Sequence, residues 1–171
     1  EDHKLDALQQ HKKGLMQELF PAESKALSKR RFPEFKHAPE WEEKPISAIG
    51  DIITGSTPST NQPQYYGGKR QFVSPADIGD NRYIEFTKTT LSDEGFAETR
   101  PVKTNSILFV CIGSTIGKIA QNREECATNQ QINAIVPRSG YSNSFAYFVL
   151  EWHAKKIAEI AGNQAVPIIN K

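Results

Sequence analysis

The apolar residues of this chain follow two different spacings, and the change falls between residues 20 and 41. After the change, short segments rich in Ile, Val, Phe and Tyr alternate with clusters of Gly, Ser, Thr, Asn and Pro, a pattern typical of short β-strands joined by turns. Before it, apolar residues recur every three or four positions, the spacing of a helix with one apolar stripe. The stripe consists of Leu5, Leu8, Leu15 and Leu19, with Lys12 at the remaining position of the 3, 4, 3, 4 spacing. The sequence therefore predicts an α+β fold, with an N-terminal coiled-coil-type helix followed by a mixed β domain.

The N-terminal helix is predicted over residues 3–19 and ends at Phe20-Pro21, because proline cannot continue the helical hydrogen bonds. So short a stripe is not stable in an isolated helix and needs a partner surface. A helix docked on its own domain and a helix paired in a coiled coil both meet this need. We assign residues 1–20 to a helical arm, 21–40 to a linker and 41–171 to the main domain.

The formal net charge of the chain is +1, and it is not concentrated in one region. Residues 1–36 carry eight Lys and Arg against six Asp and Glu, and the remainder carries thirteen against fourteen. If the main domain binds DNA, a few local cations must contact the phosphates. The linker holds one basic cluster, Lys29-Arg30-Arg31, which fits solvated linker charge better than a phosphate contact.

The main domain is predicted to contain six strands, two short helices and one long helix. The predicted strands are Ile46–Thr54, Arg70–Val73, Arg82–Phe86, Ser106–Ile112, Gly117–Gln121 and Gln131–Val136. Ser74 and Ser92 are each followed by acidic residues and predict the N-caps of one-turn helices. The long helix is predicted over Asn143–Ala161, where an apolar stripe packs on the sheet and Gly162 supplies a C-terminal stop.

Several functional classes are excluded or disfavoured by what the sequence contains. Cys111 and Cys126 form no Cys-x-x-Cys pair, the four histidines complete no zinc-ligand spacing, and Cys111 lies in an apolar run typical of a buried thiol. Apolar runs are too short to cross a bilayer, and the first residues lack a secretory pattern, so a cytoplasmic location is expected. The segment Gly113–Lys118 has too few residues between its glycines for a phosphate-binding Walker loop, and predicts a strand–turn–strand instead.

The candidate site lies in the polar loops, whose side chains are of the types that contact phosphates or base edges. Solvated turns have the same composition, so composition alone does not separate the two interpretations. The candidate DNA-binding residues are Thr57, Ser59, Thr60, Lys69, Arg70, Ser114, Thr115, Lys118, Asn129, Gln130 and Gln131. Of these, the run Asn129–Gln131 is the one that also fits a role in capping a turn.

Taken in order, several short motifs resemble the specificity subunit of type I restriction–modification systems. The resemblance covers the end of that family's central conserved helix and its second target-recognition domain, the C-terminal half of the subunit. The motifs are Leu15-Met16-Gln17-Glu18-Leu19-Phe20-Pro21, Trp41, Ile49-Gly50-Asp51, Gly55-Ser56-Thr57-Pro58-Ser59, Tyr65-Tyr66-Gly67-Gly68, Phe72-Val73-Ser74-Pro75-Ala76-Asp77-Ile78, Ile112 to Lys118, and Thr128 to Ala134.

The resemblance implies a chain that reads one half of a bipartite DNA target and is not itself an enzyme. It would direct methyltransferase and restriction subunits, to which S-adenosylmethionine, ATP and magnesium belong, with no cofactor in this chain. The first recognition domain and the distal conserved helix of the family are not in this sequence, so we expect a fragment or a half-length subunit. The leucine stripe would then meet a partner helix, and a homodimer through the arm stays open.

Two other functions remain as alternatives. The first is a protein-interaction module whose helical arm is the working surface and which does not read DNA. The second is an enzyme that uses Cys111 or His153 as a nucleophile or base, which the absence of a Gly-x-Ser-x-Gly elbow disfavours.

Overall fold

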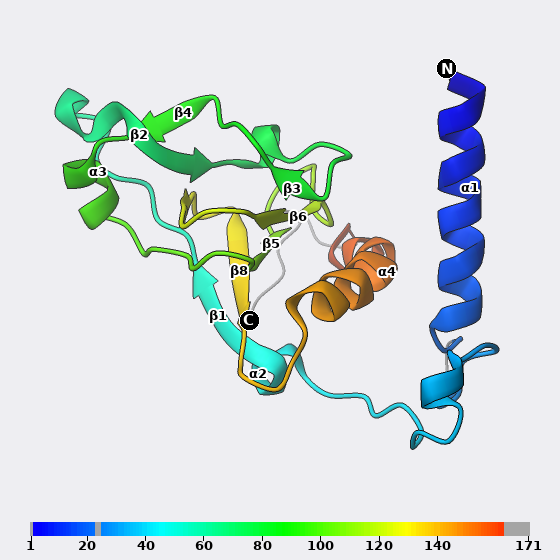
Figure 1. The fold of residues 1–171 in the computed structure, drawn as a ribbon. Helices are drawn as coiled ribbons and strands as arrows, with labels where there is room; N and C mark the ends of the chain where they lie inside the picture. Colours follow the sequence, from blue (N-terminus) through cyan, green and yellow to red (C-terminus); the bar gives the residue numbers. More distant parts are fainter. Residues whose placement is uncertain (1, 23–24, 163–171) are drawn as a thin grey trace. The chain divides into compact units, whose positions relative to one another are not determined.

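The computed structural model describes residues 2–22 and 25–162 (Figure 1). The chain divides into two compact units, residues 1–44 and 45–171. The predicted α+β fold is confirmed: helix α1 (Asp2–Leu19) comes first, mixed sheets follow, and the long helix α4 (Asn143–Gly162) comes last. Within the part of the chain that is described, no helix has the length and apolar character needed to cross a membrane.

In the first unit, the segment after α1 folds back on the end of that helix. The backbone N–H of Arg30 donates to the carbonyl of Glu18 at 3.0 Å, and their side chains form an ion pair at 3.4 Å. The backbone N–H of Trp41 donates to the carbonyl of Ala26 at 2.8 Å, and the ring of Trp41 lies 5.9 Å from that of Phe20. Trp41 therefore belongs to the first unit, whereas the sequence assigned it to the main domain.

Most side chains of the basic cluster Lys29-Arg30-Arg31 bind other groups of the same unit. Arg30 pairs with Glu18, as described above, and the guanidinium of Arg31 donates to the carbonyl groups of Ala38 and Pro39, the latter at 2.8 Å. Arg31 thereby closes a loop around the short 3-10 helix η1 (Pro33–Phe35). Two of the three cations thus stabilise the fold of the segment.

The leucine stripe of α1 stays accessible. Leu5 and Leu8 are each 57% exposed and Leu15 is 37% exposed, while Leu19 is half-buried near the end of the helix. The predicted helix over residues 3–19 is confirmed, and its apolar face is free to meet another surface. The identity of that surface remains a prediction.

The second unit is built on two sheets. The five-stranded sheet has the order β1-β8-β5-β6-β3, and the three-stranded sheet the order β4-β2-β7. In the larger sheet β1, β8, β5 and β6 are antiparallel neighbours, and β3 is parallel to β6. The bounds are β1 Gly50–Thr54, β2 Tyr66–Val73, β3 Tyr83–Ile84, β4 Thr89–Leu91, β5 Ile107–Val110, β6 Ile119–Asn122, β7 Ala127–Thr128 and β8 Ile132–Pro137.

The central strand β5 is buried on both faces, and each face has its own apolar core. Ile107 and Phe109 point to the face covered by α4, where they pack with residues such as Tyr147 and Leu150. Leu108 and Val110 point to the opposite face and pack with residues such as Val73 at the end of β2. This alternation follows from the two-residue period of a strand, and Figure 1 shows α4 and β2 on opposite sides of the sheet.

Short helices begin where the sequence places N-caps. In η3 (Pro75–Asp77), Ser74 and Asp77 form a capping box, and in α3 (Asp93–Ala97) the Ser92 hydroxyl accepts a hydrogen bond from the Gly95 N–H at 3.1 Å. Both predicted N-caps are confirmed. The remaining short elements are α2 (Ile46–Ile49) and η2 (Pro63–Tyr65).

Some strand limits predicted from the sequence are wrong. The run Ile46–Thr54 is not one strand, because its first four residues form α2; Ile46 and Ile49, three residues apart, both pack against the α4 cluster. A short apolar run does not distinguish a helix from a strand by periodicity. Strand β3 ends at Ile84 instead of Phe86, since the carbonyl of Glu85 is bound by the side chain of Gln71 at 3.0 Å.

The smaller sheet was largely missed by the sequence patterns. Strand β2 begins at Tyr66 instead of Arg70, and both residues lie opposite Leu91 because the register shifts between them. This irregularity spans Gly67 and Gly68, which read as a turn in the sequence. Strands β4 and β7 were not predicted, because three and two residues are too few to show an alternating pattern.

Candidate nucleic-acid interface

Three of the predicted polar loops emerge at one edge of the five-stranded sheet. Strand β1 ends there at Thr54, which pairs with Asn133 near the start of β8, and β5 ends at Val110, which pairs with Ile132. Because these neighbouring strands are antiparallel, the end of one lies beside the start of the next. The loops 55–62, 111–118 and 129–131 therefore meet at this edge, and we call them the edge loops.

The first edge loop is bound to the third through backbone and side-chain hydrogen bonds. The N–H of Gly55 donates to Ile132 at 3.0 Å, and the N–H of Ser56 donates to Thr128 at 2.9 Å. The hydroxyl of Thr57 donates to the amide oxygen of Gln130 at 2.7 Å. Both Thr57 and Gln130 are exposed, so this pair presents polar atoms to solvent from two loops at once.

The second edge loop is bound to the third by Gln131, which Asn129 holds in place. The Gln131 carbonyl accepts from the Cys111 N–H at 2.8 Å, and its side-chain amide donates to Ile112 at 3.3 Å. Asn129 accepts from the Gln131 N–H at 3.1 Å and donates to the Gln131 side chain at 3.0 Å. Asn129 thus orients the Gln131 side chain, which holds the two loops together, while Gln130 between them faces solvent.

The second edge loop is a glycine-containing turn. Gly113 and Gly117 have φ values of +98° and +92°, a conformation that favours glycine. A side chain at Gly117 would also press on the backbone of Ala154 in α4. The strand–turn–strand prediction is confirmed: β5 enters this turn and β6 leaves it.

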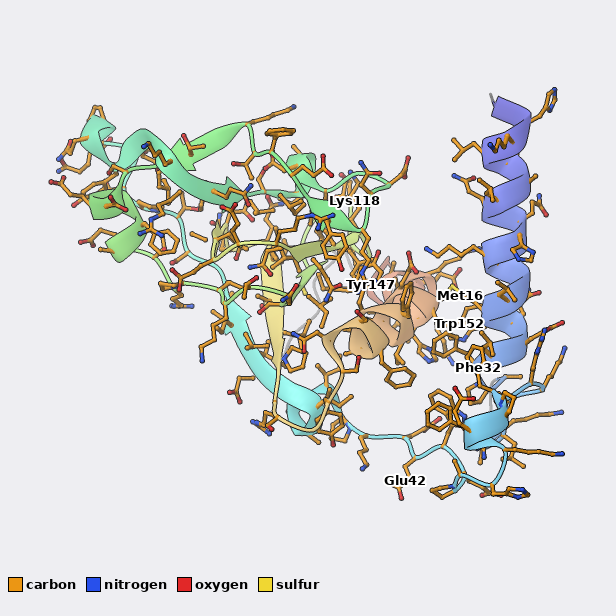
Figure 2. The ribbon with its side chains drawn as sticks, viewed as in Figure 1. Met16, Phe32, Glu42, Lys118, Tyr147 and Trp152 are labelled. Carbon is orange, nitrogen blue, oxygen red and sulfur yellow. The ribbon has the colours of Figure 1, made fainter. Side chains whose placement is uncertain are left out.

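Lys118 lies at the end of this turn beside β3 (Figure 2). Its ammonium group donates to the carbonyl of Ile78 at 2.8 Å. An ammonium group has three N–H donors, so this bond positions the cation and leaves donors for an anion. The remaining predicted side chains on the edge loops differ in exposure: Ser59, Thr60 and Ser114 are exposed, and Thr115 is half-buried.

Lys69 and Arg70 are not part of the edge loops. They are on β2 in the smaller sheet, and Lys69 is four residues before Val73, where β2 meets Asn129. At a rise of about 3.3 Å per residue this is roughly 13 Å along the strand. Nine of the eleven predicted residues therefore lie on the edge loops, namely Thr57, Ser59, Thr60, Ser114, Thr115, Lys118, Asn129, Gln130 and Gln131, and the other two lie on β2, where the Tyr66 hydroxyl donates to the Pro58 carbonyl of the first edge loop at 2.7 Å.

Arg70 is held in an acidic environment. Its guanidinium binds Asp93 at 2.8 Å, lies 3.9 Å from Glu125, and stacks 5.0 Å above the ring of Phe96. The hydrogen bond that Arg70 donates to the Asp93 carboxylate raises the pKa of Arg70 above its ordinary value. Three carboxylates and two cations line a hollow of about 380 Å³ here. Because the carboxylates repel a phosphate, this hollow attracts it less than a purely basic site would.

Arg82 is a positioning residue that the sequence patterns did not single out. It donates to Gln121 at 2.7 Å and to Ser144 at 2.6 Å, and it stacks on Tyr83 and on Tyr147 of α4, each at 4.9 Å. Figure 2 shows Tyr147 on the helix that covers the sheet. Arg82 thus fixes the start of β3 to α4. Because its partners on α4 are distant in the sequence, no local motif could have identified this role.

The family model for the type I restriction modification DNA specificity domain matches residues 39–171. The chain belongs to this family. Its specificity domain is 34% identical over 113 residues to the type I restriction enzyme HindI specificity subunit of Haemophilus influenzae, covering 65% of this chain and 24% of that protein. It is 24% identical over 133 residues to the MjaIX specificity subunit of Methanocaldococcus jannaschii, covering 75% and 31%. The chain thus spans about a quarter to a third of these relatives.

The fold of the specificity domain has close structural counterparts. A chain from a structure describing complex assembly and conformational transition of the type I R-M system aligns with a TM-score of 0.66, covering 98% of this chain and 39% of that one at 17% identity. The HsdS subunit from Thermoanaerobacter tengcongensis aligns with a TM-score of 0.62, covering 90% and 37% at 18% identity. At these identities the likeness establishes the fold.

The cysteines of the specificity domain are buried and unpaired. Burial raises the pKa of Cys126 to about 12, and it also raises the pKa of Cys111. A thiol that stays protonated at neutral pH is a poor nucleophile. The other candidate of the enzyme alternative, His153, is exposed on α4, and no cluster of three or more metal-binding side chains occurs among the described residues.

Proposed function

We propose that this specificity domain reads one half of a bipartite double-stranded DNA target through the edge loops. The supporting observation is their convergence: three polar loops, far apart in the sequence, meet at one edge and are hydrogen-bonded to one another. A rigid set of polar side chains is what base-edge readout requires, since the geometry of donors and acceptors must be fixed in advance.

Within this set, the residues divide into two roles. Lys118 contacts a phosphate, because it is an exposed cation already oriented by Ile78. Thr57, Gln130 and Ser114 offer polar groups to base edges, with Gln130 oriented by Thr57. Ser59, Thr60 and Thr115 extend the contact surface. Lys69 and Arg70 contact DNA only where the duplex extends across the smaller sheet, and we assign them a secondary role.

The proposal includes the partners implied by the family. The chain has no catalytic role of its own and directs methyltransferase and restriction subunits in the cytoplasm, and those subunits use S-adenosylmethionine, ATP and magnesium. The exposed leucine stripe of α1 supports a helical partner. As that partner we propose a second copy of the chain, in an antiparallel dimer.

The test is an anisotropy titration of the full chain with a labelled random-sequence duplex at several salt concentrations. Binding should weaken with salt, because phosphate contacts release counterions. The variant Lys118→Gln keeps a hydrogen-bond donor and removes the charge. We expect it to lower the slope of log K against log salt by about 1.

The matched control is Lys103→Gln. Lys103 is also exposed and precedes β5, so it lies at the opposite edge of the sheet from the edge loops. Its removal should leave the slope unchanged. If wild-type chain binds no duplex at low salt, the proposed function is wrong. An equal loss of slope in both variants would show that the edge loops are not the interface.

A further inference from the structure

Phe86 is the most exposed large hydrophobic side chain among the described residues, at 85%. It lies in the loop between β3 and β4, residues 85–88. A phenyl ring this open to water contributes nothing to the core of the protein. The ring is therefore available for a contact outside the fold.

The loop that carries Phe86 is held on both sides of it. On one side, the side chain of Gln71 donates to the Glu85 carbonyl at 3.0 Å. On the other, the Lys88 N–H donates to the carboxylate of Asp77 at 2.8 Å, and the Thr87 hydroxyl donates to Thr89 at 2.7 Å. The ring is therefore presented outward by a fixed backbone.

The loop adjoins the edge loops. Asp77, which binds Lys88, is followed directly by Ile78, whose carbonyl accepts the hydrogen bond from Lys118. Lys88, through its backbone N–H, and Lys118, through its ammonium group, thus attach to consecutive residues of the same short segment, and both residues are exposed. Phe86 is two residues from Lys88, so the backbone that carries the ring is joined through Asp77 and Ile78 to the segment that positions the Lys118 cation, a candidate phosphate contact.

The surroundings of the ring favour a nucleic acid over a protein as its partner. Its neighbours in the chain, Glu85, Thr87 and Lys88, are polar or charged, whereas the core of a protein interface is depleted of charged residues. A single aromatic or aliphatic side chain with a cation nearby is sufficient to enter a base step or to stack on an unpaired base.

We propose that Phe86 is a wedge that inserts into the base stack beside the half-site, with Lys88 binding the adjacent phosphate. This inference rests on the proposed function of the edge loops and adds a residue that deforms the duplex. A wedge of this kind partly unstacks a base step and bends the DNA, so sequence is sensed through the ease of that deformation as well as through direct contacts.

The experiment first enriches a random duplex pool with the wild-type full chain and then measures affinity and end-to-end energy transfer on the enriched duplexes. Phe86→Ala should bind about tenfold more weakly, the effect of removing one stacked aromatic side chain, and should lose the bend. Its salt slope should equal that of wild type, because no charge is removed. Lys88→Gln should lower the slope by about 1.

Phe86→Trp serves as the conservative variant. It should retain the affinity and the bend, and its additional indole emission, measured as the difference from wild type, should be quenched on binding. Phe35→Ala is the matched control, since Phe35 is also an exposed phenylalanine, at 56%, but lies in the first unit. It should leave affinity and bend unchanged.

The outcomes separate the two proposals. Failure of wild-type chain to bind any duplex would overturn the function of the edge loops. Wild-type binding with an unchanged Phe86→Ala variant, or an unquenched Phe86→Trp variant, would overturn the wedge alone. A Phe86→Ala variant that binds and bends DNA normally but no longer binds the methyltransferase subunit would assign the ring to a protein contact and would also overturn the wedge.

Discussion

Replacing Gly55 with alanine should strongly disrupt the packing of the edge loops. A Cβ atom built there would lie well under 3.0 Å from the carbonyl oxygens of Asn129 and Thr128. These are backbone atoms, so they cannot rotate away as a flexible side chain would. Gly55→Ala must therefore push the first edge loop away from the third.

The cost follows from the contacts that would be lost. Two backbone hydrogen bonds, Gly55 to Ile132 and Ser56 to Thr128, contribute about 1 kcal/mol each. Overpacking of a tight site adds about 1–3 kcal/mol. The sum is about 3–5 kcal/mol, a large part of the 5–15 kcal/mol typical for a protein. For a domain of this size it corresponds to a decrease in Tm of roughly 10–15 °C.

The assay is thermal and urea unfolding followed by circular dichroism, with Gly79→Ala as the matched control. Gly79 lies in a nearby loop, where a Cβ atom would meet nothing within 4 Å. Its replacement should change the free energy of unfolding by less than about 1 kcal/mol, and toward greater stability, because the unfolded chain loses freedom. If Gly55→Ala unfolds within 1 kcal/mol of wild type, the loops are not in the close contact described.

Three further predictions concern the core and the arm. Asn122 is fully buried and accepts a hydrogen bond from the Ser106 N–H at 2.8 Å, and its two amide N–H groups are shared among the carbonyl oxygens of Val102, Lys103 and Glu124. Asn122→Ala should therefore destabilise the protein by about 3 kcal/mol or more in urea unfolding, whereas replacement of an exposed residue should cost less than about 1 kcal/mol. Because burial raises the pKa of Cys126 from 9.0 to about 12, the unfolded state releases this proton first as pH rises. Stability should be unaffected by this group below pH 9 and should fall between pH 9 and 12, with a shallower fall in Cys126→Ala; identical slopes in the two proteins would contradict the assignment. Replacing Leu8 and Leu15 with Lys should abolish self-association of the chain in light scattering without changing the melting of the second unit, whereas an unchanged mass would exclude the leucine stripe as the contact.

Local features of this fold were predictable because local sequence determines them. The N-caps at Ser74 and Ser92 depend on side chains within three residues, and the turn at Gly113–Gly117 depends on glycines that tolerate positive φ. The helix over residues 3–19 follows from apolar spacing alone. The buried run Ile107–Val110 was recognisable because a strand covered on both faces is apolar throughout.

The arrangement of the candidate site was not predictable, since it depends on strand order. The edge loops meet because β1, β8 and β5 are neighbours in that order, and the chain spacing of their residues does not specify this. Arg70 resembled a phosphate contact in the sequence, yet Asp93 binds it in the fold from 23 residues away. Phe86 was taken as the end of a strand, and only the fold places its ring in solvent.

The mutual attachment of the edge loops affects how the target preference of such a domain can change. Within the third edge loop, Gln130 accepts a hydrogen bond from Thr57 of the first loop and Gln131 binds Cys111 and Ile112 of the second, so a replacement third loop with a different backbone path would break contacts with the other two. Retargeting by exchange of one loop should therefore fail where transplantation of all three as a block succeeds. Exposed side chains such as Ser59 and Ser114 can be replaced without breaking contacts between the loops. We therefore expect changes of specificity to concentrate at these positions.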